Sequence, residues 1–462
     1  MIGISLKEAA SIAGGRILSG TDDLAIKGVS TDSRAVRRGD LFIAIRGRNY
    51  DGHDFIGEAV ISGAGCVMAE EVPRLSCESR TSIPILIVDD TLEAMSRLAH
   101  YVRSRAKALV IAVTGTNGKT SVKDMIHGIL STSFRAEKSK ASYNNIVGVT
   151  RTLFDLDEGC EVLVCEIGTN NKGEIAALAD VAEPDIAVIT NIGRGHLEGF
   201  GDRKGVFEEK ISILRHLAGR REAFINGDDD LLGKVPSRTG GITMHFFGEK
   251  ENNDFIISDV EHTPEGCMFK LNGMDFSAPV FGRHNIYNAA AAISVAMSLG
   301  VTCEAARAAI KDVRLPGMRL ERMRVGPALF INDAYNANPD SFMSALDVLE
   351  NTECEGCLKG VVAGQMLELG EGSRRMHSEV GENVAARKVD FLITVGKEAG
   401  YIAEGARVGG MAPDRVFAVP GHADAARTLM ELGGGRNIVL VKGSRGARME
   451  EVIKCFTTYC IR

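Results

Sequence analysis

The sequence predicts an α/β protein of three domains: a small N-terminal domain, a central P-loop domain with a parallel sheet and appended antiparallel hairpins, and a C-terminal Rossmann-like α/β domain. Three observations lead to this prediction. A chain of 462 residues is too long for one hydrophobic core. Buried apolar runs alternate with helical segments, as a parallel sheet with crossover helices requires. Between residues 254 and 281, alternating segments are separated by turn residues, which is typical of antiparallel hairpins.

Residues 1–82 are expected to form the first domain, which mixes short strands with small helical segments. Two of its strands are predicted at Leu41–Ile45 and Gly65–Ala69. A strand at Pro84–Val88 and a helix at Thr91–Arg105 come next, and we assign residues 83–107 to a linker. This linker leads directly into the central domain.

The central domain is expected to span residues 108–314. Its first strand, Leu109–Val113, is a continuous apolar run that meets a glycine loop, and a helix follows at Ser121–Leu130. Two further buried strands are predicted at Val162–Cys165 and Ile186–Ile189. The hairpin strands and the alanine-rich helix after them are expected at Phe255–Val260, Cys267–Leu271, Asp275–Val280 and Asn285–Leu299.

The C-terminal domain is expected to span residues 315–462, because Pro316-Gly317 interrupts the helical pattern there. Buried strands again alternate with helices beyond this point, which indicates a second α/β unit. The predicted strands are Ala328–Ile331, Gly360–Ala363, Phe391–Val395, Val416–Val419 and Ile438–Val441.

Composition and charge exclude several classes of protein. The net charge of −7 argues against a general nucleic-acid binder, since phosphate backbones demand a basic face. Lys7 and Glu8 precede any long apolar run, and no stretch of about 18 uncharged apolar residues follows, so we expect no signal peptide, no membrane span and a cytoplasmic location. Cys354 and Cys357 form a CxxC pair that lacks the second pair or histidines of a zinc site, which favours reduced thiols.

The segment GTNGKTS has the form of a phosphate-binding loop between a strand and a helix. Its glycines allow a tight turn, and backbone N–H groups at the helix start can bind phosphates. Lys119 would reach the β- and γ-phosphates of ATP, and the Thr120 hydroxyl would bind Mg²⁺. Val113 stands where the usual pattern has glycine, so a chance Gly-Lys-Thr in a strand–helix turn is the alternative. The residues of the loop are Gly115, Thr116, Asn117, Gly118, Lys119, Thr120 and Ser121.

Two further polar residues follow neighbouring predicted strands. Glu166 comes at the end of Val162–Cys165, and His196 follows Ile186–Ile189 after a short loop. Because the carboxyl ends of parallel strands share one edge of the sheet, both side chains are expected near the phosphate loop. A carboxylate there can hold Mg²⁺ directly or through water. If only one of these two residues were present, a structural role would be the simpler interpretation.

At these residues the chain resembles a known family, the Mur ligases. The resemblance rests on the phosphate loop, on Glu166-Ile167-Gly168, on TNIGRGHLEGFG at residues 190–201 and on HNIYNA at residues 284–289, and it covers essentially the whole chain. It implies an ATP-dependent, amide-forming enzyme of cytoplasmic peptidoglycan-precursor synthesis. In this family a substrate carboxylate takes the γ-phosphoryl group of ATP, and an amine then attacks the resulting acyl phosphate.

The resemblance is strongest to those members that add D-alanyl-D-alanine to UDP-N-acetylmuramoyl-tripeptide. It is carried by YNANP at residues 335–339, MLELG at 366–370 and VKGSR at 441–445. STDSR at 30–34 and DGHDF at 51–55 look like the uridine-nucleotide-binding domain of these members. The resemblance also suggests a monomer. It implies that the residues near the two substrates are Ser30, Asp32, Ser33, Arg34, Asn144, Asn145, Tyr335, Asn336, Lys442, Ser444 and Arg445.

The resemblance also assigns roles around ATP and two Mg²⁺ ions. Thr120 and Glu166 would hold one ion, and His196 would lie near the second. Lys210 aligns with a carbamylated lysine of the family, which requires a neutral amine of lowered pKa. From the residues alone, Lys210 could equally belong to the surface charge cluster Glu208-Glu209-Lys210.

Four more residues are implied at the nucleotide. Asn285 and Asn288 would contact the adenine and the neighbouring site, since residues three apart share a helix face. Arg319 would bind the ATP phosphates, and Asp333 would lie near the ribose. Without the resemblance, Asn285 could be a helix cap, the Asn144-Asn145 pair a turn, and Lys442 to Arg445 a basic turn after a strand.

Two departures from the family pattern concern the substrate more than the reaction. Gln365 stands where this type usually carries aspartate, and Arg194-Gly195 replaces a small or acidic pair. The alternatives are another Mur-type ligase that adds a single amino acid, the related folylpolyglutamate synthase, or a catalytically dead nucleotide-binding regulator. The first lacks support because no Asp-Asn-Pro-Arg motif is present, and the uridine-type N-terminal segments oppose the second. The intact loop, with Glu166 and His196, opposes the third.

Overall fold

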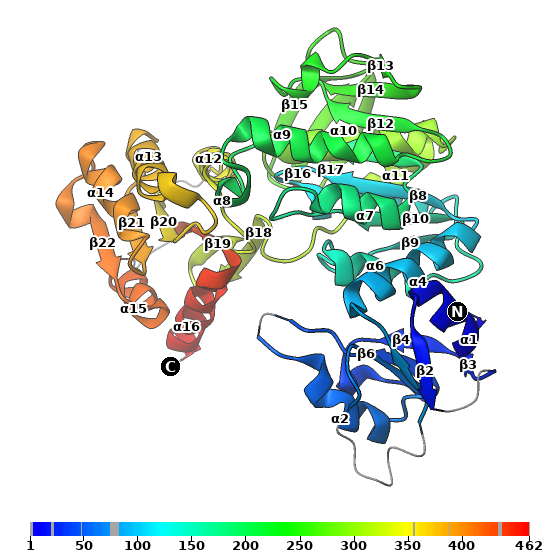
Figure 1. The fold of residues 1–462 in the computed structure, drawn as a ribbon. Coiled ribbons are helices and arrows are strands. Elements are labelled where there is room, and N and C mark those ends of the chain that lie inside the picture. The colour runs from blue at the N-terminus through cyan, green and yellow to red at the C-terminus, as the bar shows by residue number, and fades with distance from the viewer. Residues whose placement is uncertain are drawn as a thin grey trace.

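The structure is a computed structural model that describes residues 3–19, 23–47, 49–73, 83–353, 356–387, 389–432 and 437–461. It confirms the predicted three-domain α/β fold (Figure 1), in which the N-terminal domain (blue) and the C-terminal domain (yellow to red) both adjoin the central one. Cys354 of the CxxC pair and residue 82 at the first predicted boundary lie outside the described residues. In the described ranges, no helix is both long and apolar enough to traverse a lipid bilayer.

The N-terminal domain contains a mostly parallel sheet of strand order β2-β7-β6-β5-β4 and a separate antiparallel pair, β1 with β3. Since β7 pairs with β2 and β6, we propose to place residues 83–87 with this domain instead of the linker. Helix α1 begins at a capping box between Ser5 and Glu8 and packs on α4, which has its predicted bounds. The elements are β1 (Ile4–Ser5), α1 (Leu6–Ala13), β2 (Arg16–Ser19), β3 (Ala25–Ile26), β4 (Gly28–Ser30), β5 (Asp40–Ile43), α2 (Ile56–Ile61), β6 (Cys66–Ala69), β7 (Ile85–Ile87) and α4 (Thr91–Arg105).

The central sheet has the strand order β17-β16-β15-β14-β12-β11-β8-β10-β9, with β13 paired to β14. From β9 to β14 the neighbours on this path are parallel. Successive residues of β8 point to opposite faces, so Val110 and Ala112 join one core and Ile111 and Val113 another. The strands are β8 (Leu109–Thr114), β9 (Ala136–Lys138), β10 (Val162–Glu166), β11 (Ile186–Ile189), β12 (Glu222–Asn226), β13 (Arg238–Thr239), β14 (Ile242–Gly248), β15 (Phe255–Thr263), β16 (Gly266–Leu271) and β17 (Met274–Ala278).

Helices cover both faces of this sheet, which explains why its strands are continuous apolar runs. Helices α5 and α10 pack together on one face, while α6 and α7 contribute to the core on the other. The predicted hairpins are the antiparallel meander β15-β16-β17 at the sheet edge. The helices are α5 (Lys119–Leu130), α6 (Ile146–Phe154), α7 (Glu174–Ala182), α8 (Leu197–Phe200), α9 (Arg203–Ile211), α10 (Arg283–Ser298) and α11 (Cys303–Lys311).

The C-terminal sheet has the order β18-β19-β23-β20-β21-β22, in which β18 is antiparallel to β19 and the others are parallel. All five predicted strands are present, two of them with the predicted bounds. The elements are β18 (Glu321–Val325), β19 (Ala328–Asp333), α12 (Pro339–Glu350), β20 (Leu358–Gly364), α13 (Ser373–Ala386), β21 (Phe391–Val395), α14 (Gly400–Val408), β22 (Val416–Val419), α15 (His422–Leu432), β23 (Asn437–Lys442) and α16 (Glu450–Ile461).

The strand orders of the central and C-terminal sheets determine where the candidate site lies. In the central sheet β8 lies between β10 and β11, so the loops that follow these three strands meet at one edge. In the C-terminal sheet β19 and β23 are parallel neighbours that end together at Asp333 and Lys442. Side chains from the two edges line a common cavity.

Candidate functional site

The phosphate loop joins β8 to α5 and depends on two glycines. Gly115 and Gly118 have φ of 140° and 84°, in the region that L side chains avoid. A Cβ at Gly115 would lie 1.9 Å from Thr190 Oγ1, and one at Gly118 would lie 2.4 Å from Asn288 Oδ1. Lys119 Nζ donates to the carbonyls of Gly115 and Thr116 at 2.9 and 3.0 Å, so its amine folds over its own loop.

Thr120 and Glu166 meet at the carboxyl ends of β8 and β10, as the sequence predicts. The Thr120 hydroxyl donates to Glu166 Oε2 at 2.7 Å and accepts from Arg319 Nη2 at 2.8 Å. Asn144 Nδ2 donates to the other oxygen, Oε1, of Glu166 at 2.8 Å. Glu166 is buried, with 2% of its surface exposed. The result is a buried carboxylate and a hydroxyl beside the phosphate loop.

Lys210 is buried in the middle of the protein, on α9, with 1% of its surface exposed. Burial lowers the pKa of its amine well below the ordinary value, and the charge of Lys119 lowers it further, against the opposing charge of Glu209. Among the described residues, the Lys210 amine has no hydrogen-bond or ion-pair partner. The surface-cluster alternative is therefore wrong. Glu209 is also buried, and its carboxylate accepts from the backbone of Gly173 and Ile175.

His196 follows β11 and has a φ of 57°, which is unusual for a residue with a side chain. Its Nδ1 lies 2.6 Å from Glu368 Oε2 of the C-terminal domain, and Glu368 has a φ of 64°. Both residues line the cavity. Glu368 belongs to the MLELG motif at residues 366–370, and its contact with His196 is a long-range pairing that local sequence does not encode.

The donor set suits Mg²⁺. Mg²⁺ prefers oxygen ligands and is usually held by one or two carboxylates together with substrate phosphates and water. The Thr120 hydroxyl and the buried Glu166 carboxylate provide such oxygens beside the phosphate loop. The described residues contain no group of three or more His, Cys, Asp or Glu that could hold a metal unaided. A hydroxyl and one buried carboxylate fit an ion that completes its coordination with nucleotide phosphates and water.

Asn285 and Asn288 lie on the first turns of α10, against the phosphate loop. Asn288 Nδ2 donates to Asn285 Oδ1 at 2.9 Å, and Asn285 Nδ2 donates to the Phe281 carbonyl. Asn285 does not cap the helix, because α10 begins at Arg283 after Gly282. Their neighbour His284 lines the cavity, and burial lowers the pKa of its imidazole to about 4.

The C-terminal domain supplies the opposite wall. The Arg319 guanidinium lies 4.0 Å from the centre of the Tyr335 ring, and Tyr335 Oη donates to Ser142 Oγ at 2.5 Å. Lys442 pairs with Asp333 and also donates to the Asn336 carbonyl at 3.1 Å. Through Ser142, these contacts fasten the loop after β19 to the central domain.

The two remaining residues of the predicted basic turn have partners of their own. Ser444 Oγ accepts from Leu367 N–H at 2.9 Å, and Arg445 pairs with Glu450 at 2.7 Å. The Gln365 carbonyl accepts from Ser444 N–H at 2.9 Å, and Gln365 does not line the cavity. The contact of Gln365 with this turn is therefore made by its backbone carbonyl.

Some predicted residues are placed elsewhere. Asn145 caps α6, with its Oδ1 accepting from Gly148 N–H at 2.9 Å. Ser30, Asp32, Ser33 and Arg34 form a turn in the N-terminal domain, and they are not among the residues that line the cavity. Asp32 pairs with Arg34 at 2.9 Å.

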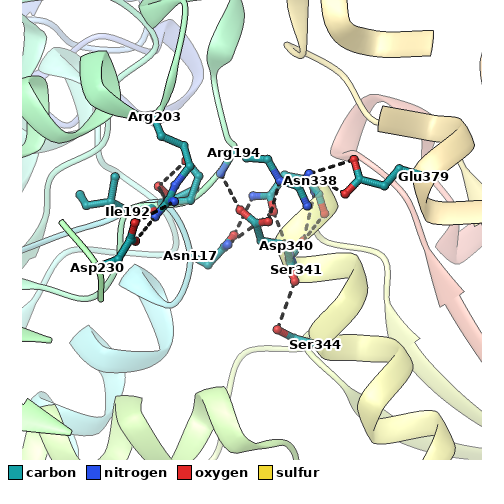
Figure 2. Close-up of polar contacts among 12 residues, drawn as sticks. Asn117, Ile192, Arg194, Arg203, Asp230, Asn338, Asp340, Ser341, Ser344 and Glu379 are labelled. Atoms are coloured by element: carbon teal, nitrogen blue, oxygen red, sulfur yellow. Dashed lines mark hydrogen bonds and ion pairs between the residues drawn. The ribbon is translucent and has the colours of Figure 1, made fainter. Parts of the chain in front are cut away.

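Polar contacts between domains complete the site (Figure 2). Asn117 of the phosphate loop and Asn338 exchange amide hydrogen bonds of 3.4 and 2.8 Å. Arg194 reaches Asp340 and Glu379 at 2.8 Å each. Asn338 belongs to the YNANP motif but is not among the predicted site residues, although its place before Pro339 is a helix-cap signal; in the structure it caps α12.

The cavity has a volume of about 770 Å³ and is lined by both domains. The predicted site residues among its lining are Thr116, Asn117, Gly118, Lys119, Thr120, Ser121, Asn144, Glu166, His196, Asn285, Asn288, Arg319, Asp333, Tyr335, Asn336, Lys442, Ser444 and Arg445. A phosphate loop on one α/β domain that faces a second α/β domain across a shared cavity is suited to bind a nucleotide between two domains that close over it.

Comparison with known proteins identifies the family. Three family models match successive parts of the chain: "Mur ligase family, catalytic domain" over residues 25–114, "Mur ligase middle domain" over 113–296 and "Mur ligase, glutamate ligase domain" over 318–445. The UDP-N-acetylmuramoyl-tripeptide–D-alanyl-D-alanine ligases of Bacillus subtilis and Escherichia coli are 35% and 34% identical to it, each alignment covering 98% of both chains. The chain belongs to the Mur ligase family.

Solved structures agree with this assignment. MurF from Acinetobacter baumannii superimposes with a TM-score of 0.90 at 29% identity, covering 99% of each chain. MurF from Thermotoga maritima in complex with ADP gives a TM-score of 0.82 at 28% identity, covering 96% of this chain and 99% of that one. A folylpolyglutamate synthase from Mycobacterium tuberculosis shares the fold, with a TM-score of 0.63 at 20% identity over 79% of this chain and 93% of its own.

Proposed function

We propose that this chain is an ATP-dependent ligase that joins D-alanyl-D-alanine to UDP-N-acetylmuramoyl-tripeptide through an acyl phosphate, in the synthesis of peptidoglycan precursors. The observation that carries the proposal is the alignment, over 98% of both chains, with curated relatives that bear this name. The cavity supports it, because groups suited to phosphate and groups suited to a second substrate face one another there.

The first half of the reaction joins two anions. A carboxylate oxygen of the tripeptide attacks the γ-phosphorus of ATP, the bond to the bridging oxygen breaks, and ADP leaves. Such an approach needs positive charge around the transferred group. We propose that Lys119 leaves the carbonyls of its loop to bind the phosphates and that Arg319 adds a second positive charge beside Thr120.

The groups around the phosphates would also hold two metal ions. Bound Mg²⁺ would neutralise charge on the β- and γ-phosphates. Thr120 and Glu166 would hold one ion, and His196 with a carbamylated Lys210 the other. Carbamate formation joins the Lys210 nitrogen to the carbon of CO₂ and releases a proton, and the lowered pKa of the buried amine favours the neutral form that this requires.

The second half of the reaction forms the amide. The amine nitrogen of D-alanyl-D-alanine attacks the acyl-phosphate carbonyl, phosphate leaves with the electrons of the C–O bond, and the ammonium loses a proton. We propose that Arg445 binds the carboxylate of the dipeptide, since its guanidinium is more exposed than the buried Lys442. Lys442 and Ser444 would hold the loops that frame this subsite, together with Tyr335 and Asn336.

The remaining predicted residues keep their proposed roles. Asn285 and Asn288 would contact the adenine end of ATP, and Asp333 its ribose. Asn144, which donates to Glu166, would lie beside the tripeptide carboxylate. The turn with Ser30, Asp32, Ser33 and Arg34 would bind the uridine nucleotide in the N-terminal domain, while Asn145 would support that side through its helix cap. We also propose that the enzyme acts as a monomer in the cytoplasm, which sedimentation equilibrium and cell fractionation would test.

The test is an assay of phosphate release with ATP, Mg²⁺ and UDP-N-acetylmuramoyl-tripeptide, with the third residue as either meso-diaminopimelate or lysine. Phosphate should appear only when D-alanyl-D-alanine is added, and mass spectrometry should show the pentapeptide product. L-alanyl-L-alanine is the matched control. Release with a single amino acid would instead identify another Mur-type ligase. No release with any acceptor would leave the nucleotide-binding regulator.

A further inference from the structure

The loop after β11 is fixed to the central domain. Thr116 N–H donates to the Asn191 carbonyl at 3.0 Å, and Gly193 N–H donates to Thr116 Oγ1 at 2.8 Å. Arg203 Nη2 donates to the Ile192 carbonyl at 2.9 Å. These bonds tie residues 191–193 to the phosphate loop and to α9. A group that binds to this loop is therefore fixed in position relative to the phosphate loop.

Arg194 extends from this loop to two helices of the C-terminal domain (Figure 2). Its backbone N–H and its Nε donate to the two oxygens of Asp340, at 2.6 and 2.8 Å. Its Nη1 donates to both oxygens of Glu379, at 2.8 and 3.0 Å. Asp340 lies in the first turn of α12, and Glu379 lies within α13. One side chain thus connects the central domain to both helices.

The first of these helices, α12, is joined to a loop that forms part of the site. The loop before α12 carries Tyr335, which lies under Arg319 and bonds to Ser142. Asn338, the cap of α12, bonds to Asn117 of the phosphate loop. A displacement of the start of α12 would therefore move these contacts with it.

The second helix, α13, follows the loop that carries Glu368. His377 of α13 accepts the Met366 N–H at 2.9 Å, which fastens that loop to the helix. Glu368, two residues on, lies beside His196. Arg194 thus binds the two helices whose preceding loops carry Tyr335, Asn338 and Glu368 to the central domain.

We propose that Arg194 is a positioning residue that holds the C-terminal domain closed over the phosphate loop through Asp340 and Glu379. Although Arg194 lines the cavity, its role in this proposal is to act through the two helices and not by contact with the reacting groups. The effect on catalysis rests on the proposed ligase function, whereas the effect on domain closure does not. A protein whose closed state is less populated binds its ligands more weakly in proportion. Removal of the clamp should therefore raise KM more than it lowers kcat.

Arg194→Ala and Arg194→Lys are compared with the wild type in full-length protein. Arg194→Ala should raise the KM for D-alanyl-D-alanine roughly tenfold and change kcat less than about twofold, because saturating substrates restore closure. The KM of Arg194→Lys should lie between those of the wild type and Arg194→Ala, because an ammonium keeps the charge but lacks the guanidinium fork that binds two carboxylates. The three side chains are 27%, 36% and 41% exposed, so salt should raise the wild-type KM and leave that of Arg194→Ala nearly unchanged.

Domain closure is measured separately by small-angle X-ray scattering without nucleotide, where Arg194→Ala should have the larger radius of gyration. Arg387→Ala is the matched control, because Arg387 also pairs with two acidic residues, Asp347 and Glu350, but within the C-terminal domain. It should change neither the radius nor the salt dependence. The proposal is overturned if Arg194→Ala keeps the wild-type radius and KM, or if Arg387→Ala reproduces its effects. A wild type that releases no phosphate would refute the ligase function and leave the scattering test standing.

Discussion

The phosphate loop requires glycine at position 118, and the substitution Gly118→Ala tests that requirement. The residue has a φ of 84°, where an L side chain costs about 1–2 kcal/mol. The added Cβ would lie 2.4 Å from Asn288 Oδ1, so the Asn288 amide must move and lose its 2.9 Å bond to Asn285, at about 1 kcal/mol. The two contributions together set an upper bound of about 2–3 kcal/mol, because effects on residues in contact do not add fully.

This cost should appear as lost nucleotide affinity. The empty loop can relax away from the strain, whereas a bound phosphate requires the original shape. Titration calorimetry with ADP and Mg²⁺ should therefore show binding weakened by at most roughly 30- to 150-fold, by the conversion of about 1.4 kcal/mol per factor of ten.

Two other glycines provide matched controls. Gly173 has a φ of 86° but open space around its Cβ, so Gly173→Ala carries the backbone strain without the collision. Gly128 lies inside α5 with nothing near its Cβ, and Gly128→Ala should stabilise the helix slightly. Neither should weaken ADP binding by more than about twofold, because neither lies in the loop. Wild-type ADP affinity in Gly118→Ala would refute the reasoning.

Three further predictions concern individual side chains. Lys119→Ala should abolish phosphate release but leave calorimetric binding of UDP-N-acetylmuramoyl-tripeptide intact, and a parallel loss of both would contradict that division of roles. Lys210→Ala should be inactive and partly rescued by formate or acetate, because a short carboxylate can replace the carbamate; full activity without additive would rule the carbamate out. Burial lowers the pKa of His284 to about 4, so the unfolded chain takes up the proton first and stability should fall as pH drops from the ordinary value of 6.5 towards 4. Over that range His284→Gln should lose less stability than the wild type, by at most about 3 kcal/mol and by less because the imidazole is partly exposed. Urea unfolding at several pH values measures this difference. Identical dependence of stability on pH in the wild type and in His284→Gln would contradict the assignment.

The predictable part of the fold follows from local pattern. Helix α4 and strands β21 and β22 have their predicted bounds, because each is a strongly periodic or continuous apolar segment between clear breaks. Strands β9 and β18 are among the strands that the sequence does not predict. β9 is three residues long, Ala136–Lys138, and β18 is a charged edge strand, Glu321–Val325, so neither has the apolar pattern of a buried strand.

The candidate site likewise has a part that the sequence predicts and a part that it does not. The approach of Thr120 to Glu166 follows from strand order alone, once the sheet is parallel. The burial of Lys210 does not follow, because its neighbour Glu208 is exposed and the charge cluster resembles a surface. The pairing of Arg194 with Asp340 joins residues 146 apart in sequence, and only the closed arrangement of two domains brings them together.

In the proposed reaction, a substrate carboxylate takes a phosphoryl group from ATP beside the phosphate loop. The most direct measurement uses UDP-N-acetylmuramoyl-tripeptide with both oxygens of the reacting carboxylate replaced by heavy oxygen, followed by mass spectrometry of the released phosphate. Attack by the carboxylate predicts that each phosphate carries one heavy oxygen. Phosphate without the label would contradict the claim, because ATP would then have been cleaved by water.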